Sequence, residues 1–108
     1  MANIAGAISI GRNVKDTPLP DAQWQRFIFE VQSAIDLAGG TIYATAYGRG
    51  EWQGVSEDNA VVTFGDVPEH VIPELRLHLG WLAEDHSQDA IALLTGESVL
   101  IGAGGVAA

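Results

Sequence analysis

The sequence predicts an α+β protein with a ferredoxin-like two-layer sandwich, in which two helices cover one face of an antiparallel sheet. Three observations lead there. The 108 residues suffice for one hydrophobic core but not two, two segments carry apolar residues at helical spacing, and the strand-like segments around them give the order β-α-β-β-α-β. An extra C-terminal strand is an option. We expect one domain over residues 1–102 and a flexible tail over 103–108.

The first predicted elements are a strand over Ala5–Ile10 and a long helix. Pro18 and Pro20 predict a loop between them. Asp21 is the expected helix N-cap, and Gly39 with Gly40 supplies a left-handed C-cap. The helix carries one apolar stripe at steps of three and four, formed by Trp24, Phe27, Ile28, Val31, Ile35 and Ala38.

A hairpin is predicted next. Residues 41–54 alternate in side-chain type with a period of two, which is typical of a strand. We expect the turn at Val55–Asn59 and the antiparallel partner at Ala60–Phe64.

The second helix has start signals at Asp66 and Pro68. Pro73 is tolerated only in a first turn, so the regular helix should begin near Ile72. Its apolar stripe is formed by Ile72, Leu75, Leu79 and Leu82. A last strand should follow from residue 89, with a tight turn at Thr95–Glu97.

Two strand segments, "AISI" and "AIALL", are apolar on both alternating faces. Helices can cover only one face of such a sheet. We therefore expect a homo-oligomer, a dimer first, in which another copy covers the second face.

Charge and composition exclude several function classes. The net charge is −9, which disfavours a nucleic-acid partner. The absence of cysteine excludes disulfides and thiolate chemistry. Neither an export signal nor a membrane-spanning apolar run is present in the sequence, so we expect a cytoplasmic protein with no membrane partner.

The segment "AYGRGEWQG", Ala46–Gly54, is the main candidate site. Its glycine spacing matches no phosphate-binding pattern. Either Gly48 and Gly50 let the strand bend or pack closely, or they leave room for a ligand. In the second case Trp52 and Tyr47 would stack on a planar group.

Arginine completes that candidate site. Arg49 and Arg12 are the expected anion-binding residues, because the chain has only five Lys and Arg residues. Strand parity places Tyr47 and Arg49 on one face and Trp52 on the other, and we expect Trp52 to belong to the core.

The three histidines, His70, His78 and His86, are eight residues apart and do not share one helix face. We expect no metal, no cofactor and no catalytic residue. Glu57 and Asp58 should be solvated in a turn. Trp81 lies off its helix's apolar stripe.

The residues Trp24, Phe27, Gly50, Trp52, Gln88 and Asp89 carry a resemblance to small bacterial and phage proteins with a W-x-x-F helix and a G-x-W hairpin. The chain also resembles, at the level of fold, dimeric α+β-barrel proteins, which include monooxygenases and isomerases. The first resemblance implies no activity. The second implies the same fold class.

Two functions are left open. The first is a non-enzymatic, oligomeric binding protein, of the phage accessory type, that holds a small anionic ligand such as a nucleotide signal, or a protein partner. The alternative is a small dimeric α+β-barrel enzyme, monooxygenase- or isomerase-like, that acts on an apolar or aromatic substrate. Its base would be one of the three histidines.

Overall fold

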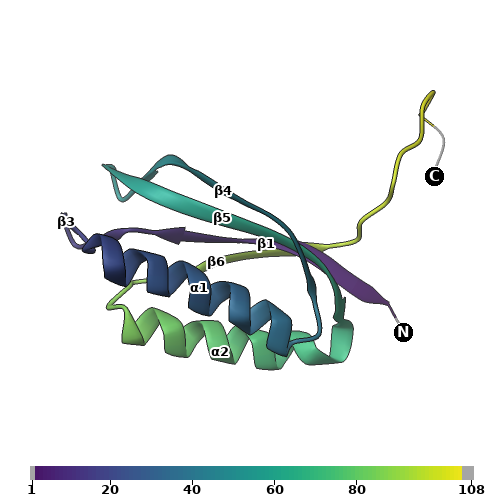
Figure 1. Cartoon of the computed structure of the whole chain (residues 1–108), viewed down its shortest axis with the longest axis horizontal. Coiled ribbons are helices and arrows are strands. Elements are labelled where there is room, and N and C mark those ends of the chain that lie inside the picture. The colour runs from purple at the N-terminus through teal and green to yellow at the C-terminus, as the bar shows by residue number, and fades with distance from the viewer. Residues whose placement is uncertain (1, 106–108) are drawn as a thin grey trace.

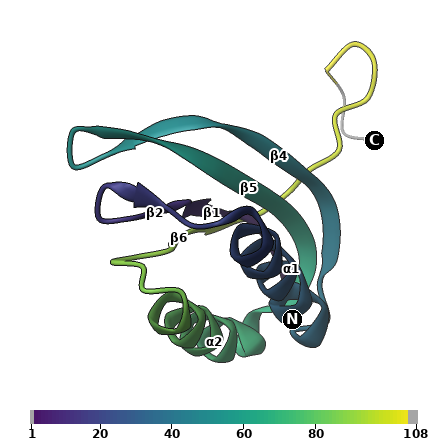
Figure 2. The same cartoon turned by 60° about the vertical axis from the view of Figure 1, so that its left-hand side comes forward.

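Four strands form one antiparallel sheet in the order β4-β5-β1-β6, and two helices cover one face of it (Figures 1 and 2). The computed structural model describes residues 2–105. Its elements are β1 (Asn3–Gly11), β2 (Asn13–Val14), β3 (Thr17–Pro18), α1 (Asp21–Leu37), β4 (Thr41–Trp52), β5 (Val55–Pro68), the 3-10 turn η1 (Glu69–Val71), α2 (Ile72–Asp85) and β6 (Ala92–Gly96). The strand order and the single helical layer confirm the ferredoxin-like α+β fold.

The core lies between the sheet and the helices. The predicted stripe of α1 is confirmed, since Trp24, Phe27, Ile28, Val31, Ile35 and Ala38 are all buried. Leu75, Leu79 and Leu82 of α2 are buried as well, whereas Ile72 is half-buried. On the sheet side, the paired residues Ile8 and Val62 are fully buried beneath the helices.

The ends of the helices differ from the sequence prediction at one place. Pro20 is the N-cap of α1, without a side-chain hydrogen bond, and Asp21 lies in the first turn. The ring of Pro20 fixes its φ angle and so sets the direction in which the chain enters the helix. The helix therefore begins without a side-chain cap. Gly39 has a φ of 84°, as the predicted left-handed C-cap requires. Pro73 lies in the first turn of α2.

The hairpin between β4 and β5 is longer than predicted. Its turn is formed by Gln53 and Gly54, whose φ angles are 52° and 81°, as in a two-residue hairpin turn. Pairing begins at Trp52 and Val55. The expected turn at Val55–Asn59 was therefore wrong, because two residues with positive φ reverse the chain earlier.

Two connecting segments also differ from the prediction. Residues 14–20, expected as a loop, take part in a short ladder in which Asn13 and Val14 of β2 pair with Pro18 and Thr17 of β3, with Lys15 at a φ of 57° in the turn. At the other end of the chain, β6 ends at Gly96 and no tight hairpin follows; residues 97–101 leave the sheet in an extended path (Figure 1).

The expected domain boundary at residue 102 stays a prediction. The described part of the expected tail, residues 103–105, is exposed and contains a turn in which the Gly105 N–H donates to the Gly102 carbonyl. The remainder, residues 106–108, lies outside the described residues.

The face of the sheet opposite the helices, here called the back face, carries uncharged and mostly small side chains where all four strands are paired. The ladders place them in two rows across the four strands, Ala92-Ser9-Val61-Ala46 and Leu94-Ala7-Thr63-Ala44. Neither helix covers this face (Figure 2), and Leu94 is 72% exposed. Because most of these side chains are small, they project little from the sheet, and a second sheet can pack closely against them.

Candidate functional site

The distal end of the β4–β5 hairpin extends past the end of β1, and this extension creates the candidate site. The last partner of β1 on β5 is Asn59, opposite Gly11, whereas β4 and β5 stay paired to Trp52 and Val55. Residues 55–57 of β5 consequently have no β1 residue paired with them on their inner side.

The β4–β5 ladder places three of the four predicted ligand-binding residues, and it puts them on two faces. Tyr47 pairs with Ala60, a core residue, and Arg49 pairs with Asp58, so both lie on the helix side of the sheet. Trp52 lies on the back-face side and is 47% exposed. The expectation that Trp52 belongs to the core was wrong, because the hairpin carries it beyond the edge of the packed layers.

Arg12 and Arg49 come together around Asp58. The Arg49 Nη1 atom lies 2.8 Å from Asp58 Oδ1, and Arg12 Nη1 lies 3.8 Å from Asp58 Oδ2. Arg12 also pairs with the Asp21 carboxylate and donates from Nε to the Leu19 carbonyl at 2.8 Å. Both guanidinium groups thus already have carboxylate partners. An anionic ligand here would have to compete with Asp58.

A cavity of about 680 Å³ lies on the Trp52 side of the hairpin. We call it the Glu57 pocket. Its walls come from the end of β1, the distal hairpin and the segment between α2 and β6. The residues that matter below are Gly11, Gly50, Trp52, Glu57, Asn59 and Asp89.

Glu57 is held in a defined position in this pocket. Its Oε2 atom accepts a hydrogen bond of 2.9 Å from the Asn13 N–H. A Cβ atom at Gly11 would collide with the Glu57 carboxylate, so the bare backbone there makes the contact possible. Glu57 is only partly exposed. The expectation that it is a solvated turn residue was wrong, because it belongs to β5.

Two glycines of the segment Ala46–Gly54, Gly48 and Gly50, serve a related purpose. The Asn59 side chain lies across them: a Cβ at Gly50 would be 2.8 Å from Asn59 Nδ2, and a Cβ at Gly48 would be 3.4 Å from Asn59 Oδ1. The glycines therefore leave room for a neighbouring side chain on the back-face side. Of the two alternatives for these glycines, close packing is the one found, and the group that packs against them is the Asn59 amide of the partner strand.

Asp89 closes the other side of the Glu57 pocket. The Trp52 Nε1 donates to Asp89 Oδ2 at 3.5 Å, a long hydrogen bond that connects the hairpin to the segment after α2. Gln88, beside it, donates from Nε2 to the carbonyls of Asn13 and His86, both at 3.3 Å. These contacts join three separate chain segments.

The charges around the Glu57 pocket are mostly negative. Four carboxylates line it, from Asp16, Glu51, Glu57 and Asp89, against one ammonium group from Lys15. Such a lining attracts cations and repels anions. The sequence analysis expected an anionic ligand near the arginines; on this side of the hairpin the lining favours a ligand with positive charge.

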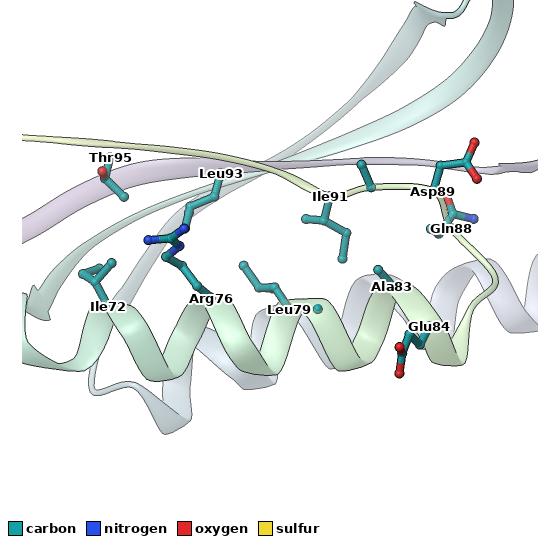
Figure 3. A pocket seen from close by; sticks show the side chains of 12 residues that line it. Ile72, Arg76, Leu79, Ala83, Glu84, Gln88, Asp89, Ile91, Leu93 and Thr95 are labelled. Carbon is teal, nitrogen blue, oxygen red and sulfur yellow. The ribbon is translucent and has the colours of Figure 1, made fainter.

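A second hollow, the α2–β6 groove, has a volume of about 600 Å³. Figure 3 shows Arg76 and Leu79 of α2 facing Leu93 and Ile91 across it, with Gln88 and Asp89 at one end. The Asp89 carboxylate points away from α2 (Figure 3). The lining of the groove is mixed: six residues are aliphatic, and five are polar or charged, namely Arg76, Glu84, Gln88, Asp89 and Thr95.

None of the three histidines lines either hollow. His86 is buried at the end of α2, where its ring stacks on Phe27 at 4.4 Å and its Nε2 lies 3.4 Å from Glu30 Oε2. The His78 ring lies 6.5 Å from the Trp81 ring. Within residues 2–105, no three metal-ligating side chains gather.

The sequence analysis did not predict that Glu57, Asn59 and Asp89 lie together in one pocket. One feature of the sequence could have indicated part of this cluster. With the reversal placed at Gln53-Gly54, the alternation Val55, Glu57, Asn59 puts the carboxylate and the amide on the same face as Trp52. The approach of Asp89 depends on a contact between residues 37 positions apart, which local pattern does not reveal.

The fold defines the chain as a member of the ferredoxin-like class of α+β sandwiches. No protein-family model matches the chain, and no curated protein sequence matches it. Among solved structures, it is similar to a phage SAM lyase in its apo state, with a TM-score of 0.61 and 18% identity over 97% of this chain and 83% of the other. It is also similar to the de novo designed protein Foldit4, with a TM-score of 0.50 and 11% identity over 89% and 96%. At these identities the likeness concerns the fold alone. Neither helix in the described part of the chain is long and apolar enough to span a membrane.

Proposed function

We propose that this protein binds a small, positively charged nucleoside derivative in the Glu57 pocket, with S-adenosylmethionine as the ligand. The observation that carries the proposal is the position of Glu57, fixed by the Asn13 N–H and the bare backbone of Gly11 at the side of a pocket that Trp52 borders. A carboxylate and an indole fit the two chemical features of this ligand, a sulfonium cation and a planar base.

The size and charge of the pocket agree with such a ligand. Small-molecule sites commonly have volumes of about 300–1,000 Å³, and the Glu57 pocket falls within this range. A cation about 5 Å from a carboxylate gains roughly 3 kcal/mol at an effective dielectric constant near 20. The exposed Trp52 ring offers a face for stacking on adenine.

The choice among cationic nucleosides comes from the phage SAM lyase, whose name states its substrate. The likeness covers 97% of this chain, and the place of the ligand in the Glu57 pocket is argued from the charge and lining of that pocket alone. We propose accordingly a cytoplasmic accessory protein of the phage type that sequesters S-adenosylmethionine. This replaces the anionic nucleotide of the sequence analysis with a cationic one.

The protein is proposed to work as an oligomer. The back face includes two uncharged rows that neither helix covers, and Leu94 and Ala46 are exposed there. Burying apolar surface of this kind stabilises association by about 25 cal/mol per Å². A second copy on this face would lie beside the Glu57 pocket, since Ser9 and Ala92 belong to both.

Calorimetric titration with two ligands tests the proposal. S-adenosylmethionine carries the sulfonium charge, whereas S-adenosylhomocysteine has a neutral thioether at the same place. We expect the first to bind at least tenfold more tightly, and Glu57→Gln to remove most of that difference. Glu74→Gln, an exposed carboxylate on α2, is the matched control. Equal affinity for both ligands, or no binding of either, contradicts the proposal.

A second candidate function is cleavage of the same ligand. The specific observation is that the fold is shared with a lyase and that a fixed carboxylate lines the pocket. In an elimination, Glu57 would take a proton from a carbon β to the sulfur; the electron pair forms a C=C bond, the C–S bond breaks, and the sulfur leaves as a neutral thioether. Mass spectrometry of the mixture after incubation separates the two functions. Binding alone leaves the ligand intact, and cleavage releases the thioether.

A further inference from the structure

The segment after β6 is aliphatic: residues 97–100 belong to no helix or strand, and Ile101 takes part in an isolated β-bridge. Val99, Leu100 and Ile101 are 66%, 76% and 63% exposed. The segment runs on from the end of β6 and away from the layers of the protein (Figures 1 and 2). We call residues 98–102 the tail strand.

The outer edge of β4 is an unprotected strand edge. Sheet edges are usually protected from pairing by charge, proline or a covering element. β4 is the edge strand of the order β4-β5-β1-β6, and residues 44–48, Ala-Thr-Ala-Tyr-Gly, contain neither a charge nor a proline. The only register shift in this ladder lies before them, between Ile42 and Ala44.

We propose that the tail strand of one copy pairs with the β4 edge, residues 44–48, of a second copy. The two segments have equal length, about 17 Å when extended. Paired there, Val99 and Ile101 would share one face and Leu100 the other, because strand side chains alternate. One of these aliphatic faces would then extend the back-face rows at Ala44 and Ala46.

The same chain cannot make this contact with itself. The tail leaves from β6, and β1 and β5 separate β6 from β4, a distance of three strand spacings or about 14 Å. Only Glu97 connects Gly96 to the tail strand, and two residues reach about 7 Å. The partner must therefore be another molecule.

The tail leaves the sheet at the end where β1 and β4 begin, whereas the acceptor residues 44–48 extend from there towards the Glu57 pocket, level with Ala7 to Gly11 of β1. Gly96 pairs with Ala5 near the start of β1, and Thr41 at the start of β4 pairs with Gly65 at the other side of that end. In a dimer with a twofold axis, each copy would supply one tail and one edge. The inference rests on the self-association proposed above and specifies which segment contributes to it.

Sedimentation equilibrium of full-length variants tests the pairing. The tail variant is Val99→Asp with Ile101→Asp, and the edge variant is Tyr47→Lys, which adds an edge charge on the helix side and leaves the back face unaltered. We expect each to weaken the association constant at least tenfold. The control is Leu77→Asp on α2, 57% exposed, which should leave the constant unchanged.

Mixing the two variants gives the sharper result. The edge variant keeps an intact tail, and the tail variant keeps an intact edge, so one pairing can form between them. We expect the mixture to associate more tightly than either variant alone. A wild-type monomer at 50 μM overturns the inference together with the proposed assembly. An oligomer that tail and edge variants leave unchanged overturns the inference alone, and neither result bears on ligand binding.

Discussion

The Glu57 carboxylate lies over the backbone of Gly11, where a Cβ atom would collide with it. Glycine at the end of β1 and glutamate on β5 therefore form one unit, which the Asn13 N–H completes. The position of the charge in the pocket depends on the absence of a side chain in a neighbouring strand.

Gly11→Ala should weaken the binding of S-adenosylmethionine about tenfold, a change of roughly 1.4 kcal/mol. The new methyl group displaces the Glu57 carboxylate from its place. Gly96→Ala is the control, because nothing lies within 4 Å of a Cβ there. Titration calorimetry measures both. Unchanged affinity in Gly11→Ala would place the ligand elsewhere.

Arg49→Ala should leave the affinity for S-adenosylmethionine within about twofold of wild type. Its guanidinium lies on the opposite side of the hairpin from Trp52 and already pairs with Asp58. Exposed ion pairs contribute roughly 0–1 kcal/mol, so the fold should survive. A loss as large as that of Glu57→Gln would favour the arginine side of the hairpin, the site expected from sequence.

Phe27→Ala should destabilise the fold by about 3–5 kcal/mol. The Phe27 ring is fully buried and packs against Trp24 and His86. Phe29→Ala, on the same helix but 65% exposed, should change the free energy of unfolding by less than about 0.5 kcal/mol. Urea denaturation of both variants provides the comparison. Similar values for the two would contradict the packing described here.

Gly80→Ala should stabilise the protein by about 0.5–1 kcal/mol. Gly80 lies inside α2, where alanine is the better helix former, and a Cβ at this position meets nothing within 4 Å. The midpoint of urea denaturation should rise with an unchanged slope. A lower midpoint would show that the α2–β6 groove does not tolerate the methyl group.

The elements defined by local pattern were predictable. The stripe from Trp24 to Ala38 and the left-handed Gly39 follow from helical spacing and from the conformational freedom of glycine, and both are found. The hairpin turn was misplaced because Gln53 adopts a positive φ, which non-glycine residues seldom do.

The candidate site was predictable only in part. The sequence pointed to the hairpin around Trp52 but not to Glu57, whose fixed position comes from Asn13, 44 residues earlier in the chain. The exposure of Trp52 likewise depends on where β1 stops relative to the hairpin. Such distances between segments are set by tertiary packing, which no local spacing encodes.

Asn3 and Gly96 both lie at the end of the sheet away from the Glu57 pocket, which opens beside Gly11 and the hairpin turn. Anchoring the molecule to a sensor surface through a tag before residue 1 would therefore leave the pocket facing the solution. The same attachment after residue 108 would hold the tail strand instead. Comparing the two orientations in one binding experiment would separate ligand uptake from self-recognition without any substitution.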